Sequence, residues 1–128
     1  MIPKFRAWDK KHDEMLEVRG ISFDTQHIWA KEMLDDEYDV NFIFLSDVEL
    51  LQSTGLEDKN GTEIYEGDVV KYDPVPNLFF ANSNFEVTRA RTGEWRIDNH
   101  RGGSGLAFCN YKVEIIGNKY EHPHLLEE

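Results

Sequence analysis

The apolar positions of this chain fall into short runs that alternate with polar residues and are separated by turn-forming residues. Alternation with a period of two is typical of strands that bury one face. Residues 5–7 and 15–18 flank a polar segment and predict a hairpin. Residues 25–34 follow neither period clearly, so they predict an irregular segment or a short helix. Further strands are predicted at residues 40–45, 68–72, 85–89, 95–97 and 106–115.

The densest turn signals lie in residues 53–72, which hold three glycines and an Asn-Gly pair between apolar runs. Asn60 and Gly61 can both adopt positive φ, as a two-residue type I′ turn requires. Leu56 and Ile64 are therefore expected on two strands that pair with each other.

Two neighbouring segments complete the turn pattern. Gly67 permits a second reversal, after which Asp68 can accept hydrogen bonds from nearby backbone amides. Residues 46–49 fit a helical capping box, but residues 48–56 also read as a strand that leads into the hairpin, and both interpretations remain open. Residues 98–105 are polar and glycine-rich and predict a long loop.

These turns are part of a family resemblance that is carried by three blocks between the two ends of the chain, and order and spacing agree across all three. Residues 4–9 form a first matching block, whereas residues 75–110 show no pattern that can be aligned. The sequence resembles the YopX family of phage and prophage proteins. The main matching residues are Gln52, Thr54, Gly55, Leu56, Asp58, Asn60, Gly61, Ile64, Tyr65, Glu66, Gly67, Asp68, Ile116, Gly117 and Asn118.

The resemblance implies an SH3-like small barrel with no established biochemical activity, and the strand pattern agrees with it. We therefore expect a mainly β protein in three parts. An N-terminal β-rich extension, residues 1–53, packs on the barrel of residues 54–118, and residues 119–128 form a short C-terminal tail.

Composition narrows the class of protein. The chain of 128 residues is 40% hydrophobic and contains 8 Phe, 5 Tyr and 3 Trp, enough for an ordinary globular core. No apolar run approaches the ~20 residues that cross a bilayer. Cys109 is the only cysteine, which excludes an internal disulfide and fits a reducing compartment. These features predict a cytoplasmic protein of the host cell, and they leave a homo-oligomer open.

The net charge of the chain indicates which kind of molecule it binds. Asp and Glu number 25 against 14 Lys and Arg, a net charge of -11, so the long-range field repels phosphate backbones. We therefore expect a phage or host protein as the partner and do not expect nucleic acid or membrane. Acidic residues and aromatic side chains form the candidate contact surface, which comprises Asp35, Asp36, Glu37, Tyr38, Phe79 and Phe80.

The sequence gives only weak signals for groups of residues that could carry out catalysis or bind a metal or phosphate. Residues 101–105 lack the Lys-Ser/Thr ending of a phosphate-binding loop, and an isolated Cys109 in an apolar run is typical of a small core residue. His122 and His124 match no usual zinc spacing. Glu94, Asp98 and His100 could form an acid and base set. We predict no catalytic, cofactor-binding or metal-binding residues, and therefore no enzyme.

The sequence thus favours a non-catalytic phage or prophage accessory protein that acts through protein contacts of an acidic surface. One alternative is a small metal-dependent hydrolase or nuclease that uses His100 or the histidines near the C-terminus. The other is a nucleic-acid-binding small barrel, which would need its basic residues to gather on one face. These residues are Lys71, Arg89, Arg91, Arg96 and Arg101.

Overall fold

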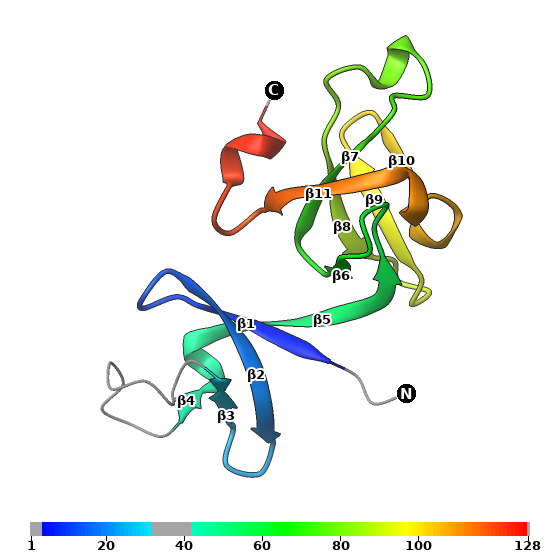
Figure 1. The fold of residues 1–128 in the computed structure, drawn as a ribbon. Coiled ribbons are helices and arrows are strands. Elements are labelled where there is room, and N and C mark those ends of the chain that lie inside the picture. Colours follow the sequence, from blue (N-terminus) through cyan, green and yellow to red (C-terminus); the bar gives the residue numbers. More distant parts are fainter. Residues whose placement is uncertain (1–3, 32–41, 128) are drawn as a thin grey trace. The chain divides into compact units, whose positions relative to one another are not determined.

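The computed structural model describes residues 4–31 and 42–127, which Figure 1 draws as a ribbon. The chain divides into two compact units, Met1–Gln52 and Ser53–Glu128. Strands dominate both units, and the helices of the described ranges are short 3-10 turns. The protein is therefore mainly β, with two antiparallel sheets that do not close and a barrel-like arrangement, which confirms the predicted fold class.

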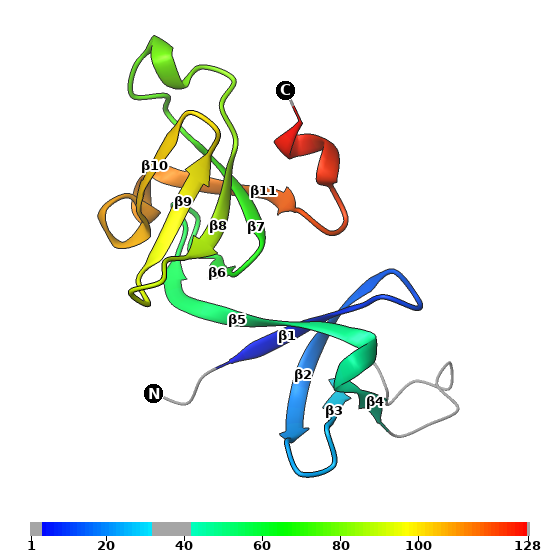
Figure 2. The same cartoon turned by 180° about the vertical axis from the view of Figure 1, so that it is seen from behind.

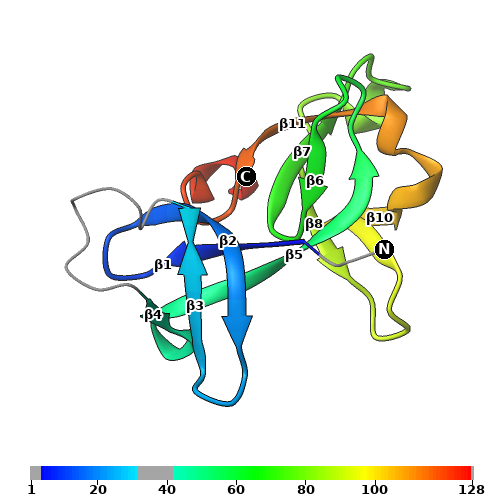
Figure 3. The same ribbon diagram turned by 60° about the horizontal axis from the view of Figure 1, so that its bottom comes forward.

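Unit 1 is an antiparallel sheet in the order β4-β3-β2-β1-β5 (Figure 3). The predicted hairpin is confirmed, because Ala7 of the first strand pairs with Leu16 of the second. Ala7, Ile28 and Val48 form the buried centre, and Ile21, Ile43 and Leu50 pack against it. The strands are β1 (Phe5–Asp9), β2 (Glu14–Ser22), β3 (His27–Ala30), β4 (Ile43–Phe44) and β5 (Val48–Glu57).

Two predictions for unit 1 are wrong in part. The described part of residues 25–34 contains strand β3, in which Ile28 and Ala30 are buried and Trp29 is exposed. Four residues are too few for a period of two to stand out from the surrounding sequence. The strand predicted at residues 40–45 is reduced in the described part to β4, and the exposed residue there is Phe44, whereas Ile43 packs on the core.

Of the two interpretations of residues 46–56, a capped helical turn or a strand that leads into the hairpin, the structure has the strand. A 3-10 turn, η2 (Leu45–Asp47), has no side-chain cap, and β5 starts directly after it at Val48. The first half of β5 pairs with β1, and the hydrogen-bonded partner of its second half is β6 (Glu63–Tyr65).

Unit 2 contains the five-stranded sheet, with strands in the order β10-β9-β8-β7-β11, all neighbours antiparallel (Figure 2). Its strands are β7 (Asp68–Tyr72), β8 (Phe85–Arg89), β9 (Trp95–Asn99), β10 (Gly102–Gly105) and β11 (Val113–Asn118). The core consists of buried side chains from these strands, from β6 and from the segment before β11. They are Ile64, Val70, Phe85, Val87, Ile97, Leu106, Cys109 and Val113.

The sequence prediction fails on both sides of Leu106. Residues 98–105 are not a long loop, because β9 continues to Asn99 and β10 pairs back onto it from Gly102. Glycine has no side chain to show an alternating pattern, so β10 gave no strand signal. Residues 106–112 are not strand but two 3-10 turns, η4 (Leu106–Phe108) and η5 (Asn110–Lys112), which bury Leu106 and Cys109 three positions apart.

The Asn-Gly hairpin is present, but its turn differs from the predicted type. Gly61 has a φ of 82°, whereas Asn60 is not among the residues of positive φ. The amide of Gly61 donates to the carbonyl of Asp58 at 3.0 Å, and the amide of Asp58 donates to the carbonyl of Thr62 at 2.9 Å. This is a three-residue connection, in which an ordinary turn is followed by one left-handed glycine.

This geometry gives a first testable prediction. We expect Gly61→Ala to lower the free energy of unfolding by about 1–2 kcal/mol, because Gly61, unlike Asn60, adopts the left-handed conformation. Asn60→Ala should cost less than about 0.5 kcal/mol. Urea denaturation of the two variants measures both values, and an equal loss for Asn60→Ala would instead support a type I′ turn.

Candidate functional site

The residues that resemble the family pattern hold the backbone of unit 2 together. Asp58 is 6% exposed, and its Oδ1 accepts hydrogen bonds from the amides of Asn60 and Thr62, each at 2.9 Å. Its Oδ2 accepts from the amide of Ile115 at 3.0 Å. One buried carboxylate therefore fastens the hairpin turn to strand β11.

Two further motif residues act in the same way. The carboxylate of Asp68 accepts a hydrogen bond from the amide of Tyr65 at 2.8 Å, across the reversal at Gly67. The side-chain oxygen of Asn118 accepts from the amides of Tyr120 and Glu121 at 3.1 and 2.9 Å. The contacts of these side chains explain why their residue types suit the turns.

The candidate contact surface lies only partly within the described residues. Phe79 is 58% exposed, and Phe80 is half-buried against the core of unit 2. The remaining members, Asp35, Asp36, Glu37 and Tyr38, lie outside the described residues.

In the predicted acid and base set, Glu94, Asp98 and His100, both acidic members are paired with a cation. Glu94 and Asp98 both pair with the guanidinium of Arg96, at 3.6 and 3.2 Å. Asp98 and His100 line a shallow hollow of about 180 Å³ together with Glu86, and Glu86 pairs with Lys119 at 3.1 Å. Two of the three carboxylates that line this hollow, those of Glu86 and Asp98, are therefore paired with a cation, and the third belongs to Glu127.

The histidines near the C-terminus have structural contacts. The Nδ1 atom of His122 accepts a hydrogen bond from the amide of Asn118 at 3.2 Å, and the ring centroids of His122 and His124 are 6.3 Å apart. Within the described ranges, no group of three His, Cys, Asp or Glu side chains is placed to share a metal ion.

In residues 4–31 and 42–127, three of the five basic residues contact other side chains, and one of them, Arg101, has its Cζ atom 6.0 Å from the ring centroid of Phe79. Arg96 is paired with carboxylates, and the Cζ atom of Arg89 lies 5.1 Å from the ring centroid of Trp95. None of the helices in the described part of the chain has the length and apolar character that crossing a membrane requires.

Cys109 is 5% exposed, and burial is the main cause that raises the pKa of its thiol. Tyr72 lies beside it, and burial, with a smaller contribution from Cys109, raises the pKa of the tyrosine hydroxyl to about 12. Both groups are therefore neutral near pH 7, and Cys109 is a core residue as the sequence indicated.

A second prediction follows for this thiol. Because the thiolate is the reactive form, a buried thiol of raised pKa reacts slowly with a disulfide reagent. In the native protein we expect Cys109 to react on the order of a hundredfold more slowly than in concentrated guanidinium chloride. A chromogenic thiol assay measures both rates, and equal rates would show that Cys109 is open to solvent.

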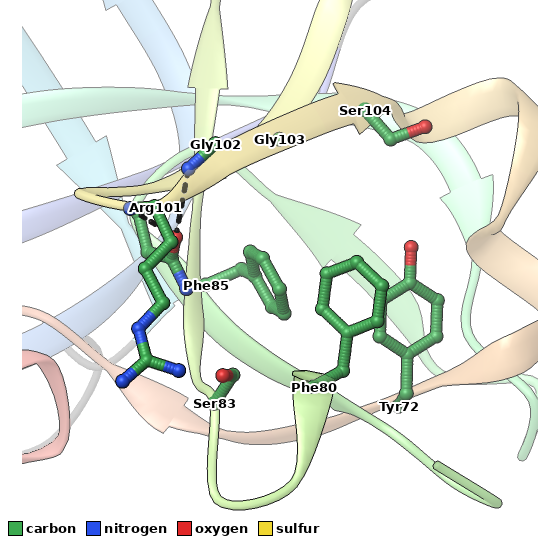
Figure 4. A pocket seen from close by; sticks show the side chains of 9 residues that line it. Tyr72, Phe80, Ser83, Phe85, Arg101, Gly102, Gly103 and Ser104 are labelled. Carbon is green, nitrogen blue, oxygen red and sulfur yellow. Dashed lines mark hydrogen bonds between the residues drawn. The ribbon is translucent and has the colours of Figure 1, made fainter. Parts of the chain in front are cut away.

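A pocket in unit 2 brings together segments that are far apart in the sequence (Figure 4). It has a volume of about 230 Å³ and lies between the end of β7, the β7–β8 loop and strand β10. The ring centroids of Tyr72 and Phe80 are 5.4 Å apart, and those of Phe80 and Phe85 are 5.9 Å apart. The nine lining residues are Tyr72, Phe80, Ser83, Phe85, Asn99, Arg101, Gly102, Gly103 and Ser104.

Asn99 shapes the polar side of the pocket. Its Oδ1 atom accepts hydrogen bonds from the amides of Arg101 and Gly102, at 2.9 and 3.2 Å, and its Nδ2 atom donates to the carbonyl of Asn84 at 3.2 Å. The first two bonds are the dashed lines of Figure 4. This amide fixes the turn between β9 and β10 and thus the position of Arg101.

The sequence did not identify this pocket. Of its lining, the sequence indicates Phe80 as a residue of the protein contact surface and Arg101 as one of the basic residues of a nucleic-acid-binding face, and it predicts a loop at residues 101–105. Ser83 and Asn99 carried no signal of their own, because a pocket built from three distant segments depends on the strand order. The one useful signal was the arginine directly before the glycine-rich segment.

Comparison with known proteins shows which family the chain belongs to. A crystal structure of protein EF1440 from Enterococcus faecalis is similar, with a TM-score of 0.69, 30% sequence identity and coverage of 99% of both chains. A comparison with curated protein sequences finds no match. The family model for YopX protein matches residues 4–127. Because that match spans nearly the whole chain, the protein belongs to the YopX family.

Proposed function

We propose that this protein is a non-catalytic phage or prophage accessory protein, which works in the host cell by binding another protein. The observation that carries the proposal is a group of exposed apolar side chains on the β7–β8 loop, residues 73–84. Leu78 is 92% exposed, Phe79 58% and Val75 46%. Clusters of exposed apolar side chains are typical of protein contact sites.

The loop is held in a defined conformation. The side-chain oxygen of Asn77 accepts a hydrogen bond from the amide of Phe79 at 2.9 Å, and the amide of Ser83 donates to the carbonyl of Phe80 at 3.1 Å. The ring of Phe80 packs on the core, so its neighbours Leu78 and Phe79 stay directed outward. A rigid apolar group loses little conformational entropy on binding, which favours its use as an anchor.

The net charge of -11 supports a partner with a basic surface. The acidic residues Asp35, Asp36 and Glu37 are the part of this proposal that rests on sequence alone. An enzyme is not proposed, because two of the three acidic side chains that line the best candidate hollow, Glu86 and Asp98, are each paired with a cation.

Affinity capture from infected host cells tests the proposal. We expect Phe79→Ser to reduce recovery of the captured partner about tenfold, the usual effect of truncating an apolar anchor. Phe108→Ser is the matched control, since Phe108 is a phenylalanine elsewhere in unit 2 that is more exposed than Phe79, at 78%. Equal losses in the two variants would reject the β7–β8 loop as the contact site.

A second arm tests the acidic surface. Reversal of Asp35, Asp36 and Glu37 to lysine should weaken capture and make it less sensitive to salt, since screening acts on exposed charges. Capture that is unchanged by reversal would remove the acidic residues from the mechanism. Hydrolysis of nucleic acid above the buffer rate with magnesium, manganese or zinc would contradict the non-catalytic assignment.

A further inference from the structure

The pocket of Figure 4 contains a hydroxyl group that the protein leaves without a partner. Ser83 is 4% exposed, and its hydroxyl lines the pocket. Its backbone amide donates to Phe80, but its side chain makes no hydrogen bond to any residue in ranges 4–31 and 42–127. The hydroxyl oxygen is open to the pocket and not sealed off by protein atoms, so it is available to a molecule bound there.

Arg101 is the one charged residue among the nine that line the pocket. Its Cζ atom lies 6.0 Å from the ring centroid of Phe79, and no carboxylate of the described residues pairs with it. In Figure 4 its guanidinium is on the same side of the pocket as Ser83. In a chain with 11 more acidic than basic residues, an arginine that lacks such a partner is free to bind an anion.

The opposite side of the pocket is apolar. Tyr72, Phe80 and Phe85 present their rings to it, as Figure 4 shows. A volume of about 230 Å³ exceeds the roughly 150 Å³ cavity that admits benzene, so a phenyl-sized group fits with an attached head group.

Strand β10 forms the remaining wall and leaves its backbone accessible. Gly102 and Gly103 are both exposed and have no side chain to cover it. Gly103 must also be glycine for the fold, because a Cβ atom there would collide with the carbonyl of Ile97 and the side chain of Asp98. A ligand that continues out of the pocket therefore meets the backbone of this strand.

We propose that this pocket binds a carboxylate attached to an aromatic or branched apolar group. The carboxylate lies on the guanidinium of Arg101 and the hydroxyl of Ser83, and the apolar group packs against the rings of Tyr72 and Phe80. The C-terminal residue of a peptide and a free aromatic acid share this chemistry. The proposal uses neither Leu78 nor Phe79 as a ligand contact, although Arg101 lies against the ring of Phe79 from the contact surface proposed above.

Nuclear magnetic resonance titration of the full chain tests the site with two probes. N-acetylphenylalanine carries the carboxylate, and N-acetylphenylalanine amide has the same apolar group without the charge. We expect the acid to shift the amide signals of Ser83 and residues 101–104, with a dissociation constant on the order of 1 mM. The amide should bind about tenfold more weakly. Equal affinity for the two probes overturns the proposal.

Variants assign the head-group contacts. Arg101→Gln should weaken binding of the acid about fivefold to tenfold, and Ser83→Ala about threefold. Arg91→Gln removes the same charge from an exposed arginine in the β8–β9 turn and should change affinity less than twofold. An unchanged affinity in Arg101→Gln, with native spectra, also overturns the proposal.

A third probe identifies the source of the ligand. If acetyl-Gly-Gly-Phe binds more tightly than N-acetylphenylalanine and also shifts the signals of β10, the pocket receives the C-terminus of a peptide. If the two acids bind equally, the pocket receives a free acid. Both results support the site, and neither depends on the outcome of the capture experiment with Phe79→Ser.

Discussion

Replacement of Asp58 by alanine is expected to lower the free energy of unfolding by about 3–5 kcal/mol. The carboxylate accepts three backbone amides from two segments, and it is 6% exposed. Its loss leaves the amides of Asn60, Thr62 and Ile115 without this acceptor. A hydrogen bond to a charged group contributes about 1.5–3 kcal/mol, and an unsatisfied buried donor adds its own desolvation cost.

Two comparison variants make this prediction specific. Asp58→Asn keeps one oxygen for the amides of Asn60 and Thr62 but places an NH₂ group opposite the amide of Ile115, so it should lose about half as much. Asp24→Ala removes a charge from an exposed turn and should change stability by less than about 0.5 kcal/mol. Urea denaturation followed by circular dichroism measures all three, and similar values for Asp58→Ala and Asp24→Ala would disprove the role of Asp58.

The contacts of Asp58 show why the turn motif predicts the fold well and the activity poorly. Like Asp68 and Asn118, Asp58 accepts hydrogen bonds from backbone amides of the same unit. Side chains that are consumed in this way are not available to a ligand. The family pattern therefore describes how unit 2 is built, whereas the pocket uses residues outside that pattern, such as Ser83 and Arg101.

The strands that could be predicted from sequence are those with alternating side chains of normal size. Residues 85–89 and 68–72 were predicted with the bounds of β8 and β7, because each has apolar residues on the buried face and a turn at both ends. Strand β3 was missed because it has four residues. Strand β10 was missed because three of its four residues are glycine, which gives no hydrophobic period.

The pocket could not be derived from sequence for a different reason. Tyr72, Ser83 and Arg101 come together only because the sheet order places β10 two strands from β8, with the β7–β8 loop folded beside them. Local patterns hold no information on that order. The turn at Asn60 shows a related limit, since Asn-Gly allows two hairpin geometries and the hydrogen bonds to Asp58 select one of them.

The core of unit 2 depends on Phe85, and Phe85→Ala is expected to lower the free energy of unfolding by about 3–5 kcal/mol. The ring is 2% exposed and packs edge-on against Tyr72 at 5.6 Å, so alanine leaves a cavity that the surrounding sheet cannot close. Phe85→Leu fills most of that space and should cost about 1–2 kcal/mol. Phe108→Ala, at a phenylalanine that is 78% exposed, should cost less than about 0.5 kcal/mol, and urea denaturation of the three variants gives the order. A loss in Phe108→Ala as large as that in Phe85→Ala would mean that the packing centre of the barrel lies at η4 and not between β7 and β8.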